Sequence, residues 1–165
     1  MKEWFDELYF KNRERWAGLK ARMDFLFRTI QQYHPKTVLD VGCGTGFLVA
    51  KLRRGGVEAW GMDWTGAAGK LIPDWYIIGD ATQRYPFADQ SFDVVISTDV
   101  FEHLPPDSID QTRDEMLRVG KVVLASIGFT PEHVFAGEKM DTHLTVRPRH
   151  WWEAKIAPIK VINKP

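Results

Sequence analysis

The stretch "VLDVGCGTGF" at residues 38–47 limits what this chain can fold into more than any other part of the sequence. An apolar run reaches Asp40, glycine stands at 42, 44 and 46, and Phe47 opens a helical pattern. Glycine has no Cβ, so it accepts positive φ and lets the backbone come close to a ligand. A glycine-rich turn from a strand into a helix is typical of α/β proteins that bind a ligand where the first strand ends.

The spacing of these glycines excludes two common phosphate-binding turns. A dinucleotide turn follows G-x-G-x-x-G, and a P-loop requires G-x-x-x-x-G-K-[ST]. Here the third glycine comes one residue early, Phe47 takes the place of the last dinucleotide glycine, and no lysine follows. The carboxylate of Asp40 disfavours phosphate and suits a ligand with an ammonium or sulfonium group. The pattern predicts a cationic, nucleoside-containing ligand, although the turn taken alone is equally consistent with a structural role.

The rest of the chain alternates between strand and helix patterns. Near-continuous Val, Ile and Leu within the strands indicate parallel strands that are covered on both faces. We therefore predict a doubly wound, mostly parallel α/β sheet with helices on both faces, preceded by a helix with an apolar stripe from Trp16 to Ile30. The predicted strands are 37–41, 57–63, 75–80, 92–98 and 121–126, the predicted helices are 46–54, 65–72 and about 107–118, and one short helix and one edge strand follow near the end.

Length and composition predict one domain over residues 1–165, because 165 residues with 44% apolar content can bury one core. We divide it into an N-terminal helical segment (1–36), a cofactor-binding core (37–126) and a substrate lid with the C-terminal helix and strand (127–165). The 22 basic and 22 acidic residues cancel, which gives no support to nucleic-acid or membrane partners. The single cysteine, Cys43, and the lack of an apolar leader or a span of about 20 apolar residues predict a cytoplasmic protein.

Two further carboxylates stand where predicted strands end. Asp63 ends the second strand, the usual place for an acidic residue that accepts hydrogen bonds from ribose hydroxyls. Asp80 ends the third strand, where its carboxylate can reach an exocyclic amine. Together with Asp40, these side chains form a row that suits an ammonium group, a ribose and an adenine.

At this point the sequence resembles the class I S-adenosylmethionine-dependent methyltransferases, over residues of about 37–126. The residues that carry the resemblance are "VLDVGCGTG", "GMDWT", "GDAT" and "FDVVISTDVFEHL", in this order. The resemblance implies S-adenosylmethionine as cofactor, S-adenosylhomocysteine as product, and no metal. It implies the following contacts: Asp40 and the backbone of Gly42, Cys43, Gly44 and Gly46 at the methionine moiety, Asp63 at the ribose, Trp64 at the adenine face, Asp80 and Ala81 at the adenine edge, and Thr98 near the sulfonium. For Trp64, a place in the core is an equally open interpretation.

The acceptor side is less constrained. In the resembling family, "EHL" after the fourth strand is typical of members that act on small molecules, and the Asn/Asp-Pro-Pro-aromatic motif of amine-methylating nucleic-acid enzymes is absent. His103 and His143 are the candidate general bases, with a helix-starting role for His103 as the alternative.

The C-terminal part offers weaker signals. Trp151 and Trp152 predict either an acceptor wall or an anchor for the last helix, and an excess of basic residues there suggests an anionic acceptor. The histidines at 133, 143 and 150, with Asp141, have no compact ligand spacing, so no metal site is predicted. A C-terminal part too short for the family's reversed hairpin predicts an exposed sheet edge and self-association.

Two functions therefore stay open. The first is methyl transfer to an oxygen, nitrogen or carbon nucleophile of a small-molecule acceptor. The alternative is a non-catalytic partner subunit that binds S-adenosylmethionine or S-adenosylhomocysteine. RNA methylation is disfavoured by the balanced charge and by the missing amine-methylating motif.

Overall fold

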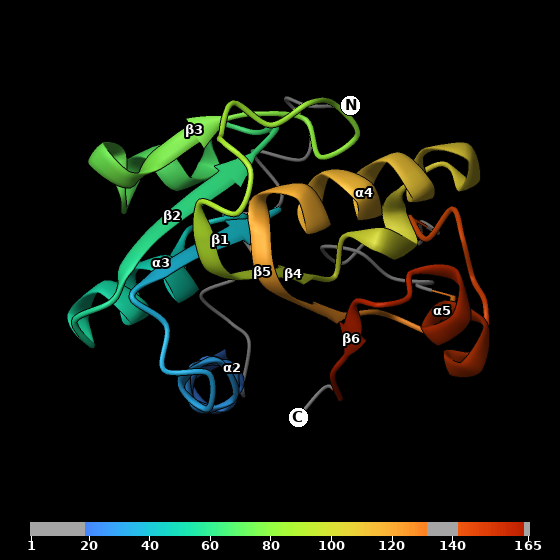
Figure 1. The fold of residues 1–165 in the computed structure, drawn as a ribbon, viewed down its shortest axis with the longest axis horizontal. Helices are drawn as coiled ribbons and strands as arrows, with labels where there is room; N and C mark the ends of the chain where they lie inside the picture. Colours follow the sequence, from blue (N-terminus) through green and yellow to red (C-terminus); the bar gives the residue numbers. More distant parts are fainter. Residues whose placement is uncertain (1–18, 132–141, 164–165) are drawn as a thin grey trace.

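The computed structural model describes residues 19–131 and 142–163, which form a six-stranded sheet in the order β3-β2-β1-β4-β5-β6. Every pairing between the described strands is parallel, which confirms the predicted doubly wound α/β fold (Figure 1). The strands are β1 (Thr37–Val41), β2 (Glu58–Asp63), β3 (Tyr76–Ile78), β4 (Phe92–Thr98), β5 (Gly120–Ser126) and β6 (Lys160–Val161). The strand order reverses between β1 and β4, and ligands of such sheets bind outside the carboxyl ends of the strands at this reversal.

Helices cover both faces of the sheet and create two apolar cores. The helices are α2 (Leu19–Gln31), α3 (Phe47–Arg54), α4 (Ile109–Val119) and α5 (Arg149–Lys155). On one face α2 and α3 bury residues such as Leu26 and Leu52, and on the other α4 and α5 bury residues such as Met116 and Trp152. Neighbouring strand residues alternate between these cores, because successive side chains of a strand point to opposite faces. Residues on both faces are apolar, and this explains the near-continuous apolar strands of the sequence.

The predicted boundaries differ from the structure where turn-forming residues compete with regular structure. The strand predicted at 75–80 ends at Ile78, and Asp80 then accepts hydrogen bonds from the amide and hydroxyl of Thr82, both at 2.8 Å. The helix predicted at 65–72 is replaced by two short 3₁₀ turns, η1 (Ala67–Lys70) and η2 (Pro73–Trp75). Glycine is a poor helix former and the residue before proline avoids the helical region, so the stretch cannot sustain an α-helix. Further 3₁₀ turns, η3 (Phe101–His103) and η4 (Pro106–Ser108), precede α4.

At each side of the sheet, an arginine from a helix occupies a strand carbonyl that no neighbouring strand pairs with. The short β3 pairs only with the carboxyl half of β2, and beyond it Nη1 of Arg53 donates to the Ala59 carbonyl at 3.0 Å. At the other edge, Nη2 of Arg149 donates to the Val161 carbonyl at 2.8 Å. The edge strand predicted near the end of the chain is β6, which has two residues and runs parallel to β5.

Candidate functional site

The glycine loop joins β1 to α3 and is hydrogen-bonded to the end of β2. The Gly42 amide donates to the Met62 carbonyl at 2.7 Å, and Gly42, Gly44 and Gly46 have φ values of 74°, 55° and 78°. A Cβ at Gly42 would lie 2.2 Å from Cγ2 of Val100, and one at Gly46 would lie 2.6 Å from Cγ1 of Ile72. Positive φ and close packing thus both require glycine at 42 and 46, whether or not a ligand is bound.

Asp63 connects this loop to the end of β2. Its side chain is buried, its Oδ2 accepts the Gly44 amide at 2.8 Å, and its Oδ1 accepts both the amide and the hydroxyl of Thr65 at 2.9 Å. The carboxylate that the resemblance assigns to the ribose is therefore also the acceptor that holds the glycine loop in place. The spacing of the sequence predicts the position of Asp63, but not this second role.

The other cofactor candidates lie at neighbouring strand ends. Asp40, near the end of β1, is buried between β2 and β4, where it pairs with Gly61 and Ile96. Asp80 is exposed in its turn after β3, and the Ala81 carbonyl accepts the Tyr85 hydroxyl at 3.0 Å. The Trp64 side chain is 43% exposed, so it is not a core aromatic. Cys43 is buried within the loop.

The segment after β4 links the glycine loop to the acceptor side. Thr98 ends β4 and is half-buried, and Asp99 follows with a φ of 56° and an amide that donates to Ser126 at 2.8 Å. The Asp99 carboxylate forms an ion pair with Arg22 in the first turns of α2. Val100 then packs against Gly42, and η3 begins at the next residue. The chain that carries His103 is therefore in direct contact with the glycine loop.

His103 and His143, which the sequence places on separate loops, lie side by side. Their ring centroids are 4.8 Å apart and the planes are inclined by 77°. Nδ1 of His103 lies 2.9 Å from the Thr142 carbonyl oxygen, and Nδ1 of His143 lies 2.7 Å from the Thr130 carbonyl oxygen. A carbonyl oxygen can only accept a hydrogen bond, so each Nδ1 carries a proton, and in the neutral rings the Nε2 atoms carry the lone pairs. We call these two residues the histidine pair.

The C-terminal aromatic and basic residues do not converge on the histidine pair. Trp152 is fully buried and packs edge-on against Phe101, so it anchors α5 to the core. Arg149 is bound to Glu153 in addition to the β6 edge, and Lys155 is bound to Asp110 on α4. The suggestion of an anionic acceptor therefore receives no geometric support and stays a prediction.

Metal-ligating residues are scattered in the described part of the chain. Within residues 19–131 and 142–163, no three His, Cys, Asp or Glu side chains cluster so that they could hold a metal ion. Residues 133 and 141, two of the four weak candidates, lie outside the described residues. Among the described helices, none has both the length and the apolar character needed to cross a membrane.

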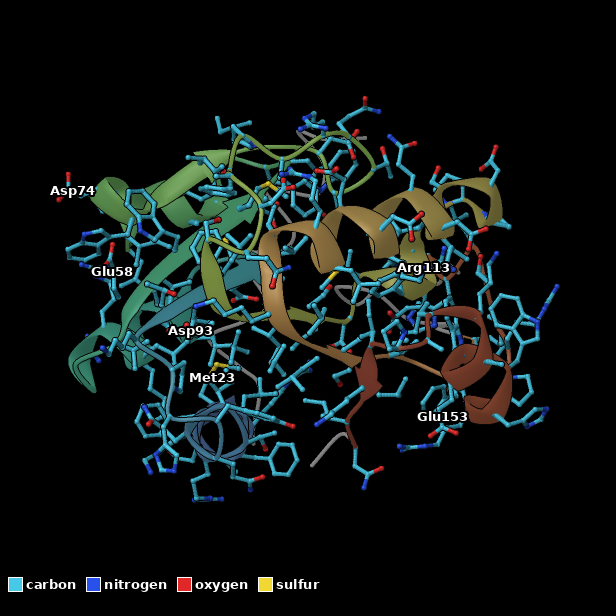
Figure 2. All side chains as sticks on the ribbon, viewed as in Figure 1. Met23, Glu58, Asp74, Asp93, Arg113 and Glu153 are labelled. Atoms are coloured by element: carbon cyan, nitrogen blue, oxygen red, sulfur yellow. The ribbon has the colours of Figure 1, made fainter. Side chains whose placement is uncertain are left out.

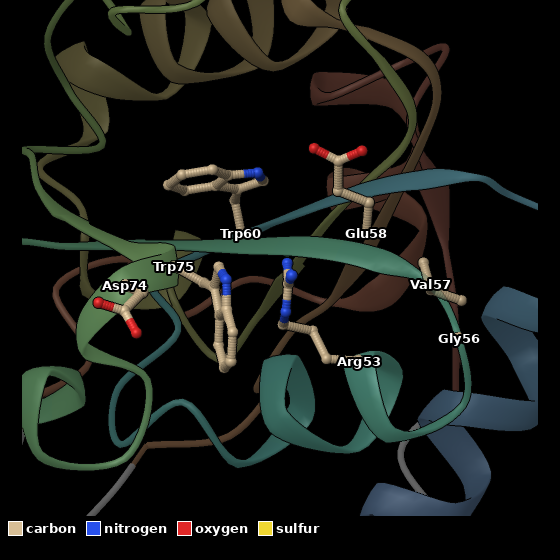
Figure 3. Close-up of a pocket in the computed structure, with 7 residues that line it drawn as sticks. All are labelled: Arg53, Gly56, Val57, Glu58, Trp60, Asp74 and Trp75. Atoms are coloured by element: carbon tan, nitrogen blue, oxygen red, sulfur yellow. The ribbon is translucent and has the colours of Figure 1, made fainter.

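A pocket of about 460 Å³ lies at the amino end of β2, remote from the glycine loop (Figure 3). Trp60 and Glu58 lie on one side of the β2 ribbon, and Trp75 and Arg53 lie on the other, where the guanidinium stacks on the indole at 3.9 Å. The pocket contains none of the predicted site residues. We assign the candidate site to the strand ends instead, because ligands of doubly wound sheets bind there.

Comparisons with known proteins identify the family of this chain. A family model described as "Methyltransferase domain" matches residues 39–122, which include the glycine loop, Asp63, Asp80 and η3. An uncharacterized methyltransferase of Mycobacterium sp. (strain KMS) is 40% identical over 92 residues, which are 51% of this chain and 34% of that protein. A ubiquinone biosynthesis O-methyltransferase of Proteus mirabilis is 31% identical over 135 residues, which are 74% of this chain and 51% of that protein.

Among solved structures, the PH0226 protein of Pyrococcus horikoshii has a TM-score of 0.61 and 26% identity, over 73% of this chain and 58% of that protein. The chain thus spans between a third and about two thirds of the length of the relatives it matches. The matched residues are those that form the strand-end site. The chain belongs to the class I S-adenosylmethionine-dependent methyltransferase family.

Proposed function

We propose that this chain transfers a methyl group from S-adenosylmethionine to an oxygen, nitrogen or carbon nucleophile of a small-molecule acceptor. One observation carries the proposal: His103 follows Val100, which packs against the glycine loop, and the ring of His143 from a distant segment lies beside the ring of His103. A base for the acceptor and a cofactor loop are thereby held next to one another. Such alignment of two reactants can lower a barrier by several kcal/mol, on the order of 7–11 in the best cases.

The strand-end residues fit the cofactor. Two buried carboxylates, Asp40 and Asp63, favour a positively charged ligand with hydroxyl donors. Asp63 would accept the ribose hydroxyls while it keeps the Gly44 amide, because each carboxylate oxygen has two lone pairs. Trp64, Asp80 and Ala81 would contact the adenine, and Thr98 would lie near the sulfonium.

The bound cofactor would supply an activated methyl group, whose bond to sulfur breaks, leaving the electron pair on sulfur, as the acceptor bonds to the methyl carbon. The protein holds the acceptor in line and removes a proton where the acceptor must lose one. Nε2 of His103 or of His143 would take this proton, because each Nδ1 already donates to a carbonyl. The name of the Proteus relative, an O-methyltransferase, favours oxygen among the three acceptor atoms.

A small-molecule acceptor agrees with the zero formal net charge, which provides no attraction for RNA. The lone cysteine also supports a cytoplasmic location as part of the proposal. The non-catalytic alternative differs only in turnover. Cofactor binding without methyl transfer to any acceptor pool would favour it.

Calorimetric titration with S-adenosylmethionine and S-adenosylhomocysteine tests the first half of the proposal. We expect micromolar binding to the parent and loss of binding in Asp63→Ala, followed by release of S-adenosylhomocysteine when acceptors are screened. Absence of binding in the parent would overturn the enzyme assignment for this chain. Tight association with tRNA that weakens steeply with salt would point to an RNA substrate instead.

A further inference from the structure

We infer that Glu102 is a positioning residue that holds the histidine pair in its geometry, an inference whose catalytic consequence rests on the proposed function. Glu102 lies in the middle of η3 with 0% of its surface exposed. Removing a carboxylate from water is strongly unfavourable unless the protein provides compensating contacts. The complete burial of Glu102 therefore indicates that contacts inside the protein stabilise this side chain.

The first contact fixes the turn that carries His103. The Glu102 carboxylate accepts the amide of Gly128, two residues beyond β5, through a short hydrogen bond. The bond joins the chain after β4 to the chain after β5, at the carboxyl edge of the sheet. Hydrogen bonds to charged groups stabilise a protein more than hydrogen bonds between neutral groups do.

The second set of contacts fixes the segment that carries His143. The Glu102 carbonyl accepts the Thr145 amide at 3.0 Å, and the Leu104 carbonyl accepts the Thr145 hydroxyl at 3.1 Å. His103 adds its bond to the Thr142 carbonyl. Thr142 and Thr145 are thus attached at three points to η3 and the residue that follows it, and one of these points is the Glu102 carbonyl.

Gly128 brings these two sets of contacts together. A Cβ at this residue would lie 2.7 Å from Oε1 of Glu102 and 2.7 Å from Cε1 of His143. The carboxylate and the imidazole therefore pack against the same small surface, with no room for a side chain between them. Glu102 fixes Gly128, and Gly128 forms the surface on which the His143 ring rests while its Nδ1 bonds to Thr130.

Two substitutions of Glu102 separate positioning from burial alone. Glu102→Gln keeps an oxygen that can accept the Gly128 amide, whereas Glu102→Leu removes it at similar volume. We expect Gln to retain turnover within about threefold and Leu to lose at least about tenfold in kcat, less than the roughly 10²–10⁴-fold of a general base that is removed altogether. Calorimetric binding of S-adenosylmethionine should stay within about twofold in both, because the Glu102 bonds described above go to Gly128 and Thr145 on the acceptor side.

A readout without an acceptor keeps the inference separate from the proposed function. The imidazole ¹⁵N shifts in long-range NMR spectra report which ring nitrogen carries the proton. Both histidines should show protonated Nδ1 in the parent and in Glu102→Gln, and a mixture of tautomers in Glu102→Leu. If no acceptor is methylated by the parent but the tautomers respond as stated, positioning stands and the catalytic proposal fails.

Gly128→Ala tests the same geometry from the other side, should Glu102→Leu fold poorly. The added methyl must displace Glu102 or His143, so we expect the same loss of the Nδ1 signature. Gly69→Ala is the matched control, because a Cβ at Gly69 would have nothing within 4 Å. Unchanged histidine tautomers in both Glu102→Leu and Gly128→Ala would overturn the inference.

Discussion

The Gly44 amide donates a 2.8 Å hydrogen bond to Oδ2 of Asp63, so the carboxylate that we propose for the ribose also holds the glycine loop. In Asp63→Ala the Gly44 and Thr65 donors lose their acceptor inside the protein. Each unsatisfied buried donor costs about 1–3 kcal/mol. We expect the melting temperature to fall by about 2–4 °C per kcal/mol, in addition to the loss of cofactor binding.

Asp80→Ala is the control for that experiment. Asp80 is exposed, and among the described residues its carboxylate accepts hydrogen bonds from Thr82 within its own turn. We expect weaker cofactor binding with a melting temperature within about 1 °C of the parent, because exposed side chains contribute little to stability. Equal thermal losses in the two aspartate variants, measured by calorimetry, would contradict the loop-holding role of Asp63.

Replacing each histidine of the pair separately tests which one takes the proton. The two variants are His103→Gln and His143→Gln. In the variant that removes the base, we expect kcat to fall by about 10²–10⁴, the usual contribution of a general base. The other variant should change kcat less. Single-turnover kinetics with S-adenosylmethionine would separate the two, and unchanged turnover in both would rule out a histidine base.

The ion pair between Arg22 and Asp99 ties α2 to the segment after β4. Both side chains are mostly buried, at 17% and 25% exposure, so their coupling should exceed that of a surface pair. We expect a double-mutant cycle of Arg22→Ala and Asp99→Asn to give a coupling of about 1 kcal/mol in chemical denaturation. The pair Lys20 and Asp24 is the comparison, because Lys20 is 92% exposed, and coupling of equal size there would contradict this expectation.

The stability of the fold should decline in acid. The Lys121 ammonium and the amides of Lys36 and Thr37 hold the pKa of Asp93 well below its ordinary value of 3.8, at the amino end of β4 (Figure 2). Hydrogen bonds from Lys51 and Lys20 likewise lower the pKa of Asp24 to about 2. A lowered folded-state pKa means that the unfolded chain binds protons first as the pH falls. These contributions are complete above about pH 5 and disappear as the pH falls below 3.8 through the folded values.

Asp93→Asn should therefore reduce stability at pH 7 and flatten its decline between about pH 5 and 2. Thermal unfolding followed by circular dichroism at several pH values measures both effects. Asp74→Asn is a suitable control, because Asp74 is exposed and makes no hydrogen bond or ion pair with the residues that the structure describes. A pH profile of Asp93→Asn that runs parallel to that of the parent would contradict the assignment.

The sequence predicts self-association through an exposed sheet edge. Arg53 and Arg149 make this pairing less favourable, because each occupies a carbonyl at one side of the sheet. With the carbonyls of Ala59 and Val161 occupied by Arg53 and Arg149, a second copy would find fewer acceptors there. We expect Arg149→Ala to sediment with a larger fraction of dimer than the parent at the same concentration. A parent that dimerises as strongly as the variant would show that another surface is responsible.

The sequence predicts those features that depend on local pattern. β1 and β4 have the predicted boundaries, because their Val and Ile runs are buried on both faces and end at clear turn residues. Asp40 and Asp63 lie near the carboxyl ends of β1 and β2 as predicted, whereas Asp80 lies in the turn two residues beyond the end of β3. The structure differs at η1 and η2, where glycine and proline favour tight turns over the expected helix.

Contacts between distant segments could not be predicted in the same way. The adjacency of His103 and His143 depends on the Thr145 and Thr142 hydrogen bonds to η3, and no periodicity encodes these. The burial of Glu102 could not be predicted either, because an acidic residue shortly before two prolines is more often solvated. Only the short "EHL" stretch drew attention to this place.

The parallel direction of β6 has a practical consequence for the design of expression vectors. The Ile162 amide donates to the Ala125 carbonyl, so the chain leaves β6 level with the carboxyl end of β5, near the residues that lead to Gly128. A peptide tag inserted directly after Asn163 would emerge at this end of the sheet, where it would compete with small ligands. Binding assays should therefore use protein from which such a tag has been cleaved.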